Sequence, residues 1–215
     1  PVRPERFAMQ RRAFAQLMTA LFGASALGWA HASDEAPDAM VKRISTEVLD
    51  AVKADPAIQA GDVGRITALV DSKIMPNVNF ERMTASAVGR YWRQATPEQQ
   101  KKLQDEFKTL LVRTYSGALG EVKDQTLSFK PTRMKAGDTE VVVRSEVKGK
   151  GEPIQLDYRL EKSGDSWKIY DLNVLGVWLV ETYRTQFAQE ISAKGIDGLI
   201  AALAQRNKSN TAKAG

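Results

Sequence analysis

The sequence predicts a segregated α+β fold, in which helices precede and follow a curled antiparallel sheet of about four strands. Apolar residues recur every three to four positions in the first half of the mature chain. After Gly120 they alternate with polar residues, and in the last quarter the helical spacing returns. Helices laid across the concave face of such a sheet enclose an apolar cone. We therefore expect a single domain, and the pattern fits both a filled core and an apolar cavity.

Four helices are expected before the sheet, over residues 34–54, 62–75, 79–93 and 96–118. The clearest start is Thr96-Pro97-Glu98-Gln99, a capping box with proline at the first helical position. Asp55-Pro56 and Pro76 end the first two helices, because proline cannot continue a helix.

The strands are expected at residues 126–129, 140–147, 154–161 and 167–174. The third is the cleanest, since Ile154, Leu156, Tyr158 and Leu160 alternate with polar residues, as in a half-buried antiparallel strand. Gly176 is expected to end the sheet. A helix follows and breaks at Gly195, a short helix covers residues 198–204, and the polar tail 207–215 is expected to be disordered.

The first 32 residues have the pattern of an export signal. Met9 to Arg12 gives a positive start, residues 13–30 are mainly apolar, and Ala30-His31-Ala32 is a small-x-small cleavage site. We expect Met9 to be the true start and cleavage after Ala32, leaving the domain 33–206 and its tail. A membrane anchor is the alternative, although polar residues dilute the apolar run. Arg11-Arg12 fits both ordinary and twin-arginine export.

Composition excludes many functions. The chain has no cysteine, and its only histidine, His31, lies in the predicted signal. The mature protein then has no thiol nucleophile, imidazole base, Cys/His zinc site or His-ligated haem, so we expect no cofactor. Loss of residues 1–32 lowers the formal net charge from +5 to +2, which removes the main argument for nucleic-acid binding.

Catalytic motifs are absent from the sequence. No nucleotide-binding glycine motif, G-x-S-x-G or EF-hand loop occurs. Ser145 and Lys148 match S-x-x-K, but residues three apart on a strand point to opposite faces. Asp157 and Asp171 remain the only candidate catalytic acids, so the sequence favours a protein that is not an enzyme.

Two stretches of the chain carry a family resemblance. One runs from Val78-Asn79-Phe80-Glu81-Arg82-Met83-Thr84 through Val88-Gly89-Arg90-Tyr91-Trp92 and Ala95 to Gln100, and on to Phe107, Leu111 and Thr114-Tyr115. The other runs from Trp167-Lys168-Ile169-Tyr170-Asp171-Leu172 through Gly176-Val177 to Lys194-Gly195-Ile196-Asp197-Gly198-Leu199. Together they resemble the periplasmic phospholipid-binding proteins of the maintenance-of-lipid-asymmetry (Mla) system, also called the toluene-tolerance family, over roughly residues 36–206.

The resemblance implies a soluble carrier in the Gram-negative periplasm with a cystatin- or NTF2-like cone. Its cargo would be a glycerophospholipid, held without any cofactor. Its partners would be an outer-membrane lipoprotein–porin complex and the substrate-binding subunit of an inner-membrane ABC transporter. Headgroup preference, oligomeric state, docking surfaces and the direction of transport do not follow from these residues.

We expect the cavity to be lined by apolar residues that face inward from the helices and the sheet. The expected lining residues are Phe80, Met83, Tyr91, Phe107, Leu110, Leu111, Tyr115, Val141, Val143, Leu156, Tyr158, Val174, Val177 and Trp178. No arginine cluster at helical spacing is evident that would clamp a phosphate.

Two other functions stay open at this point. One is an NTF2-like isomerase or dehydratase, which needs a buried carboxylate of raised pKa beside Tyr158 or Tyr170. The other is a periplasmic adaptor that does not bind lipid, which needs a solid core and an exposed apolar patch.

Overall fold

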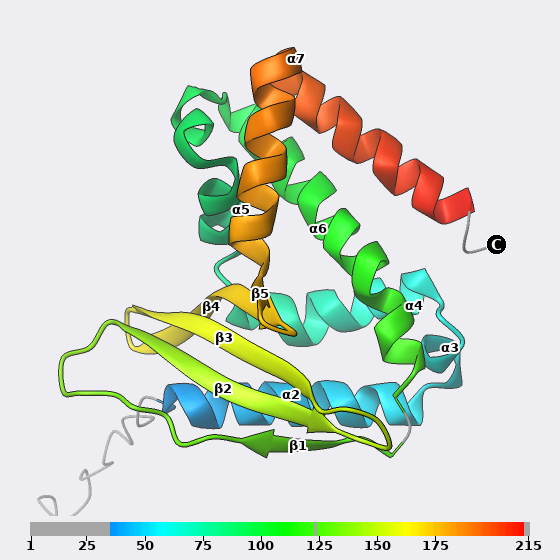
Figure 1. Ribbon diagram of the computed structural model, residues 1–215, viewed down its shortest axis with the longest axis vertical. Coiled ribbons are helices and arrows are strands. Elements are labelled where there is room, and N and C mark those ends of the chain that lie inside the picture. Colours follow the sequence, from blue (N-terminus) through cyan, green and yellow to red (C-terminus); the bar gives the residue numbers. More distant parts are fainter. Residues whose placement is uncertain (1–34, 123, 213–215) are drawn as a thin grey trace, which may run out of the picture. The chain divides into compact units, whose positions relative to one another are not determined.

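The computed structural model describes residues 35–122 and 124–212. The predicted signal, residues 1–32, lies outside this range, and so do its cleavage site and the proposed start at Met9. The last three residues of the predicted tail also lie outside it. Residues from Asp34 onward form one unit of the chain, and everything below concerns that unit (Figure 1).

The helices before the sheet begin and end largely where the sequence indicates. They are α2 (Pro37–Ala54), α3 (Pro56–Gln59), α4 (Val63–Leu69), the π-helical turn η2 (Val70–Ile74), the 3₁₀ turn η3 (Met75–Asn77), α5 (Phe80–Val88), the 3₁₀ segment η4 (Gly89–Gln94) and α6 (Pro97–Gly120). The helix expected over residues 79–93 is broken at Gly89. This glycine has φ +66°, in the left-handed region that side-chain-bearing residues rarely adopt, so α5 ends there and η4 takes a new direction.

The predicted capping box at the start of α6 is confirmed. The Thr96 hydroxyl accepts the backbone N–H of Gln99 at 3.2 Å, and the Gln99 side chain accepts the N–H of Thr96 at 3.0 Å. Two otherwise unpaired backbone donors of the first turn are thereby satisfied, which fixes where this 24-residue helix begins.

The sheet is an antiparallel meander with the strands in chain order. Its strands are β1 (Thr126–Phe129), β2 (Glu140–Lys148), β3 (Ile154–Ser163), β4 (Ser166–Val174) and β5 (Val177–Trp178). The fifth strand arises because the chain does not leave the sheet at Gly176. Leu175 and Gly176, with φ +53° and +87°, form a tight two-residue hairpin, and the Asn173 side chain accepts the N–H of Gly176.

The strand register separates an apolar face of the sheet from a polar face. Val143, Tyr158 and Leu172 are direct neighbours on β2, β3 and β4, so their side chains share one face. The next set along the strands includes Asp157 and its partner Asn173, which point to the other face. Helices α2, α5, α6 and α7 pack against residues of the apolar face.

After β5 the chain forms α7 (Leu179–Ala212), which bends at Gly195 into the two arms visible in Figure 1. The expectation of a disordered tail from Asn207 needs correction, since the helix continues to Ala212. Asn207 is buried, and its side-chain amide donates to the backbone carbonyl of Glu106 at 3.0 Å and to its carboxylate at 2.7 Å. These bonds fasten a polar helix end to α6, which sequence polarity alone does not indicate.

Buried apolar residues form three clusters. The helical cluster comprises Met83, Ala87, Val88, Leu103, Phe107, Leu110, Leu179, Val180, Tyr183, Phe187, Ile191, Leu199 and Leu203. The sheet cluster comprises Met40, Val41, Ile44, Val141, Val143, Leu160, Trp167 and Ile169. A third cluster, of Val52, Ile58, Ile66, Leu69 and Val112, joins α2, α3 and α4 to α6.

Thr96→Ala should lower the free energy of unfolding by about 1 kcal/mol, because the first turn of α6 loses its cap. Urea denaturation measures this. Thr109→Ala is the control, since Thr109 lies in the interior of the same helix and its hydroxyl bonds back to the Asp105 carbonyl. Equal effects of the two substitutions would contradict the assigned role of the capping box.

Candidate functional site

The candidate site lies where the helical cluster and the sheet cluster adjoin on the apolar face of the sheet. Tyr158 packs against the sheet cluster, whereas Leu172, its direct neighbour on β4, packs against the helical cluster. Val78, from the segment before α5, packs against both clusters. These three residues mark a boundary between two hydrophobic cores that share one sheet face.

The structure brings most of the expected lining residues to one or the other side of this boundary. Met83, Phe107 and Leu110 belong to the helical cluster, and Phe80, Tyr91, Leu111, Tyr115 and Val174 pack against it. Val141 and Val143 belong to the sheet cluster, and Tyr158 packs against it. Leu156 is half-buried on the same sheet face, opposite Val174.

Two expected lining residues lie elsewhere. Trp178 pairs with Asn173 on β4, so its side chain is on the polar face, where the Arg159 guanidinium lies 3.9 Å from its ring centroid. Val177 is 51% exposed at the end of the sheet, beside Leu175, which is 65% exposed. The sequence pattern predicts Trp178 at the inward-facing start of a helix, and the β4–β5 hairpin explains the difference.

The centre of the helical cluster is fully buried, whereas large apolar side chains that pack against it are only partly buried. Phe107 and Leu110 have no exposed surface, and the Phe107 ring centroid lies 4.9 Å from that of Tyr183. Leu111, directly after Leu110, and Tyr115, one turn further along α6, remain half-buried. Burial raises the pKa of Tyr115 and of Tyr158, so both phenols are neutral over the physiological pH range.

Asp171, one of the two candidate acids, is 1% exposed on the polar face and is fully engaged. One carboxylate oxygen accepts the backbone N–H groups of Leu172 at 2.9 Å and Val180 at 3.1 Å, and the other accepts Arg159 Nη1 at 3.0 Å. Burial raises its pKa, while these bonds act in the opposite direction. The bond to Val180 ties β4 to the first turn of α7, so Asp171 has a structural role that the sequence did not reveal.

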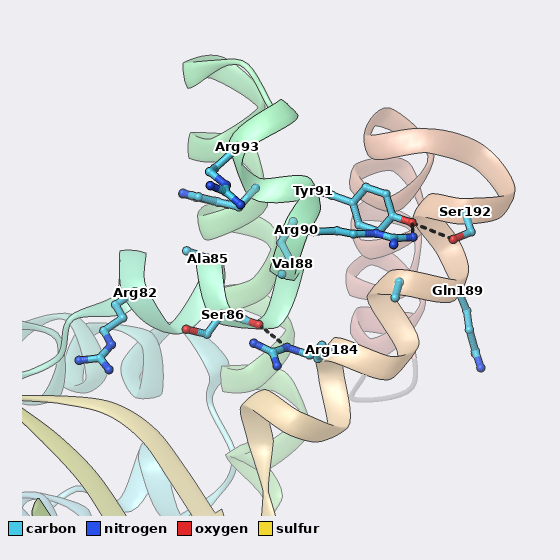
Figure 2. Close-up of a pocket in the computed structure, with 13 residues that line it drawn as sticks. Arg82, Ala85, Ser86, Val88, Arg90, Tyr91, Arg93, Arg184, Gln189 and Ser192 are labelled. Atoms are coloured by element: carbon cyan, nitrogen blue, oxygen red, sulfur yellow. Dashed lines mark hydrogen bonds between the residues drawn. The ribbon is translucent and has the colours of Figure 1, made fainter. Parts of the chain in front are cut away.

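A groove lies between α5–η4 and the first arm of α7 (Figure 2). We call it the arginine groove. Its volume is about 890 Å³. It is lined by Arg82, Ala85, Ser86, Val88, Gly89, Arg90, Tyr91, Trp92, Arg93, Arg184, Ala188, Gln189 and Ser192. Among the four arginines that line the groove, only Arg90 and Arg93 lie three residues apart in the sequence. This pair is the one sequence feature that could have indicated the groove.

A second hollow, of about 810 Å³, lies over the polar face of the sheet. It is lined by Lys130, Pro131, Arg133, Glu140, Val141, Val142, Arg144, Arg159 and Tyr170. Arg82 of α5 stacks 3.6 Å from the Tyr170 ring centroid and forms ion pairs with Glu140 and Glu161. This arginine fastens α5 to strands β2 and β3.

Within residues 35–122 and 124–212 no group of three or more His, Cys, Asp or Glu side chains is placed to hold a metal ion. In the same part of the chain no helix has the length and apolar character needed to cross a membrane.

Helices packed over the apolar face of one antiparallel sheet, with partly buried apolar side chains around its clusters, define an α+β protein. The family model described as "MlaC protein" matches residues 42–205. The chain belongs to the MlaC family, as the sequence resemblance predicted.

Relatives agree with this assignment. The chain is 27% identical to the toluene tolerance protein ttg2D of Pseudomonas putida over 164 residues, 76% of each chain. It is 22% identical over 177 residues to the intermembrane phospholipid transport system binding protein MlaC of Haemophilus influenzae, covering 80% of this chain and 83% of that protein.

Among solved structures, the chain is similar to a phospholipid-binding protein from Ralstonia solanacearum in complex with a phospholipid. The identity is 50% and the TM-score 0.79, over 83% of this chain and 99% of the other. The family and this structure confirm the predicted α+β class, and the names of the Haemophilus and Ralstonia proteins are those of a phospholipid transport and a phospholipid-binding protein.

Asp171→Ala should lower the free energy of unfolding by about 1–3 kcal/mol, because the buried Val180 N–H and the Arg159 guanidinium both lose their acceptor. The control is Asp105→Ala, on the exposed face of α6. Urea denaturation of both variants measures the difference. Loss of stability no greater than in the control would contradict the proposed link between β4 and α7.

The Asp171 carboxyl also gives a pH signature. Since its pKa is raised in the folded state, the folded chain holds this proton at higher pH than the unfolded chain does. Its contribution to the free energy of unfolding therefore falls as the pH rises from the ordinary aspartate pKa through the raised value. Asp171→Asn should remove that component from the pH profile of unfolding, and an unchanged profile would show that another group titrates.

Proposed function

We propose that this protein is a periplasmic carrier of glycerophospholipid that buries the acyl chains between the helical cluster and the sheet cluster. The observation that carries the proposal is the boundary at Val78, Tyr158 and Leu172, where two cores meet on one sheet face. Parting them there would expose apolar surface on both sides without breaking a strand pair. The phospholipid complex of the 50% identical relative supports this choice of cargo.

The physical need for such a carrier lies in the cost of moving acyl chains through water. Each CH₂ transferred from hydrocarbon to water costs about 0.8 kcal/mol, so about 30 methylenes cost roughly 24 kcal/mol gross. An apolar interior removes most of this cost and needs no covalent step. We accordingly propose that the protein is not an enzyme. Asp171, the buried carboxylate of raised pKa, has both oxygens occupied by structural partners, which disfavours the isomerase alternative.

The proposed route follows from the family. The protein would exchange lipid with an outer-membrane lipoprotein–porin complex and with the substrate-binding subunit of an inner-membrane ABC transporter. The name of the Haemophilus relative, an intermembrane phospholipid transport system binding protein, supports a role between two membranes. Cleavage of the export signal after Ala32 would release the mature carrier into the periplasm.

Protein purified natively from the periplasm should carry close to one phospholipid per chain, with a new N-terminus at Ser33. Native mass spectrometry measures both quantities in one experiment. Protein free of lipid that turns over a small substrate would instead support an isomerase. Protein with neither lipid nor activity would support the adaptor alternative.

Leu111→Glu should leave the protein folded and strongly reduce copurified phospholipid, because a charge beside the boundary opposes burial of acyl chains. Leu119→Glu is the matched control: Leu119 is half-buried on the same helix but packs against the third cluster. Circular dichroism checks folding, and lipid phosphorus per chain measures cargo. Equal lipid content in the two variants would place the acyl chains elsewhere.

A further inference from the structure

We propose that the arginine groove is a docking site for an acidic, amphipathic segment of a partner protein. This inference concerns a surface separate from the acyl-chain boundary. On α5, Met83 and Ala87 belong to the helical cluster, Arg82, Ala85 and Ser86 line the groove, and Val88 does both. The groove can therefore be tested whether or not lipid is bound.

All charged side chains that line the groove are positive. Four arginines line it, and no carboxylate does. Arg82 is neutralised by Glu140 and Glu161 on the sheet. Within the described part of the chain, Arg90, Arg93 and Arg184 have no carboxylate within ion-pair distance, and nearby Glu190 pairs with Lys194 instead. Three exposed guanidinium groups thus lack a counter-charge within the protein.

Two of these guanidinium groups are already held in position. Arg184 Nε donates to the Ser86 carbonyl at 2.9 Å, which leaves its four terminal N–H groups available. Arg90 Nη2 donates to the Tyr91 hydroxyl at 2.8 Å, and that hydroxyl lies 3.1 Å from Ser192 Oγ (Figure 2). The Ser192 and Arg90 bonds lower the pKa of Tyr91. An incoming carboxylate would find donors that have already lost much of their freedom.

The spacing of the cations favours an extended ligand over a single anion. Arg184 is anchored to Ser86, and Arg90 is linked through Tyr91 to Ser192, eight residues further along α7. Eight residues of helix span about 12 Å. Donors spread along two elements in this way suit carboxylates spaced along a peptide. Ala85, Val88 and Ala188 supply an apolar floor between them, which suits an amphipathic segment.

Other occupants fit less well. A flat bilayer surface cannot enter a concave groove between two helices. The chain's own first 33 residues carry four arginines and one glutamate, so their charge has the same sign as the groove. An acidic partner segment matches both the charge and the shape.

The experiment uses the mature protein, labelled with ¹⁵N, and a synthetic amphipathic peptide of about 14 residues with glutamates along one helical face. The expected result is saturable shifts of the Ser86, Gly89, Gln189 and Ser192 amides, with affinity that falls as salt is added. A peptide with glutamine in place of every glutamate should bind about tenfold more weakly. Equal affinity of the two peptides, or shifts confined to other surfaces, would overturn the proposal.

The variant R90Q/R93Q/R184Q should lower the affinity for the acidic peptide about tenfold and leave that for the glutamine peptide unchanged. Arg133→Gln is the control, because it removes an exposed arginine from the hollow over the polar sheet face. A thermal melt of each variant reports folding. An equal loss with Arg133→Gln would show non-specific charge attraction and overturn the proposal.

Two further titrations separate the alternative ligands. Inorganic phosphate that saturates the same amides as tightly as the acidic peptide would assign the groove to a small anion. Vesicles of phosphatidylglycerol that shift the same amides would assign it to a membrane surface. Either result overturns the peptide assignment. Lipid content measured on the same samples tests the carrier function separately, because loss of peptide binding with lipid retained contradicts only the docking site.

Discussion

One sheet face has to serve two groups of helices, and the rest of the structure follows from that constraint. Helix α2 covers the part of the face that contains Val143. Helices α5, α6 and α7 cover the part next to Leu172. Each group has its own buried centre. The hydrogen bonds between the strands lie beneath the boundary, and one further backbone bond, from the Asn79 N–H to the Ile169 carbonyl at 2.8 Å, joins the segment before α5 to β4 beside it.

Polar side chains link the helices to the strands around this boundary. Asp171 ties β4 to the start of α7, and Arg82 ties α5 to β2 and β3. Both act at the margins of the helical group, where they fix its position without filling the boundary itself. Such an arrangement lets apolar contacts rearrange around a ligand while the elements that bear them stay in register.

Much of this fold could be predicted from local signals. Thr96 and Gln99 predict a helix start because a capping box depends on four consecutive residues alone. The alternation from Ile154 to Leu160 predicts a strand with one apolar face. The positions of Trp178 and of the arginine groove could not be predicted in this way. Trp178 changes face because of a hairpin at Leu175 and Gly176, and Arg184 meets Arg90 only through the packing of α7 on α5. Local pattern fixes the direction of a side chain within its element, but a site between elements depends on their packing.

The most direct test of the central claim is to map the acyl chains themselves. A phospholipid with a photoreactive diazirine near the end of one acyl chain would be loaded into the mature protein, irradiated, and the labelled peptides identified by mass spectrometry. Acyl chains between the two clusters should label peptides containing Leu111, Tyr158 and Leu172, from both sides of the boundary. Labelling confined to the polar sheet face around Trp178, or to the arginine groove, would contradict the account.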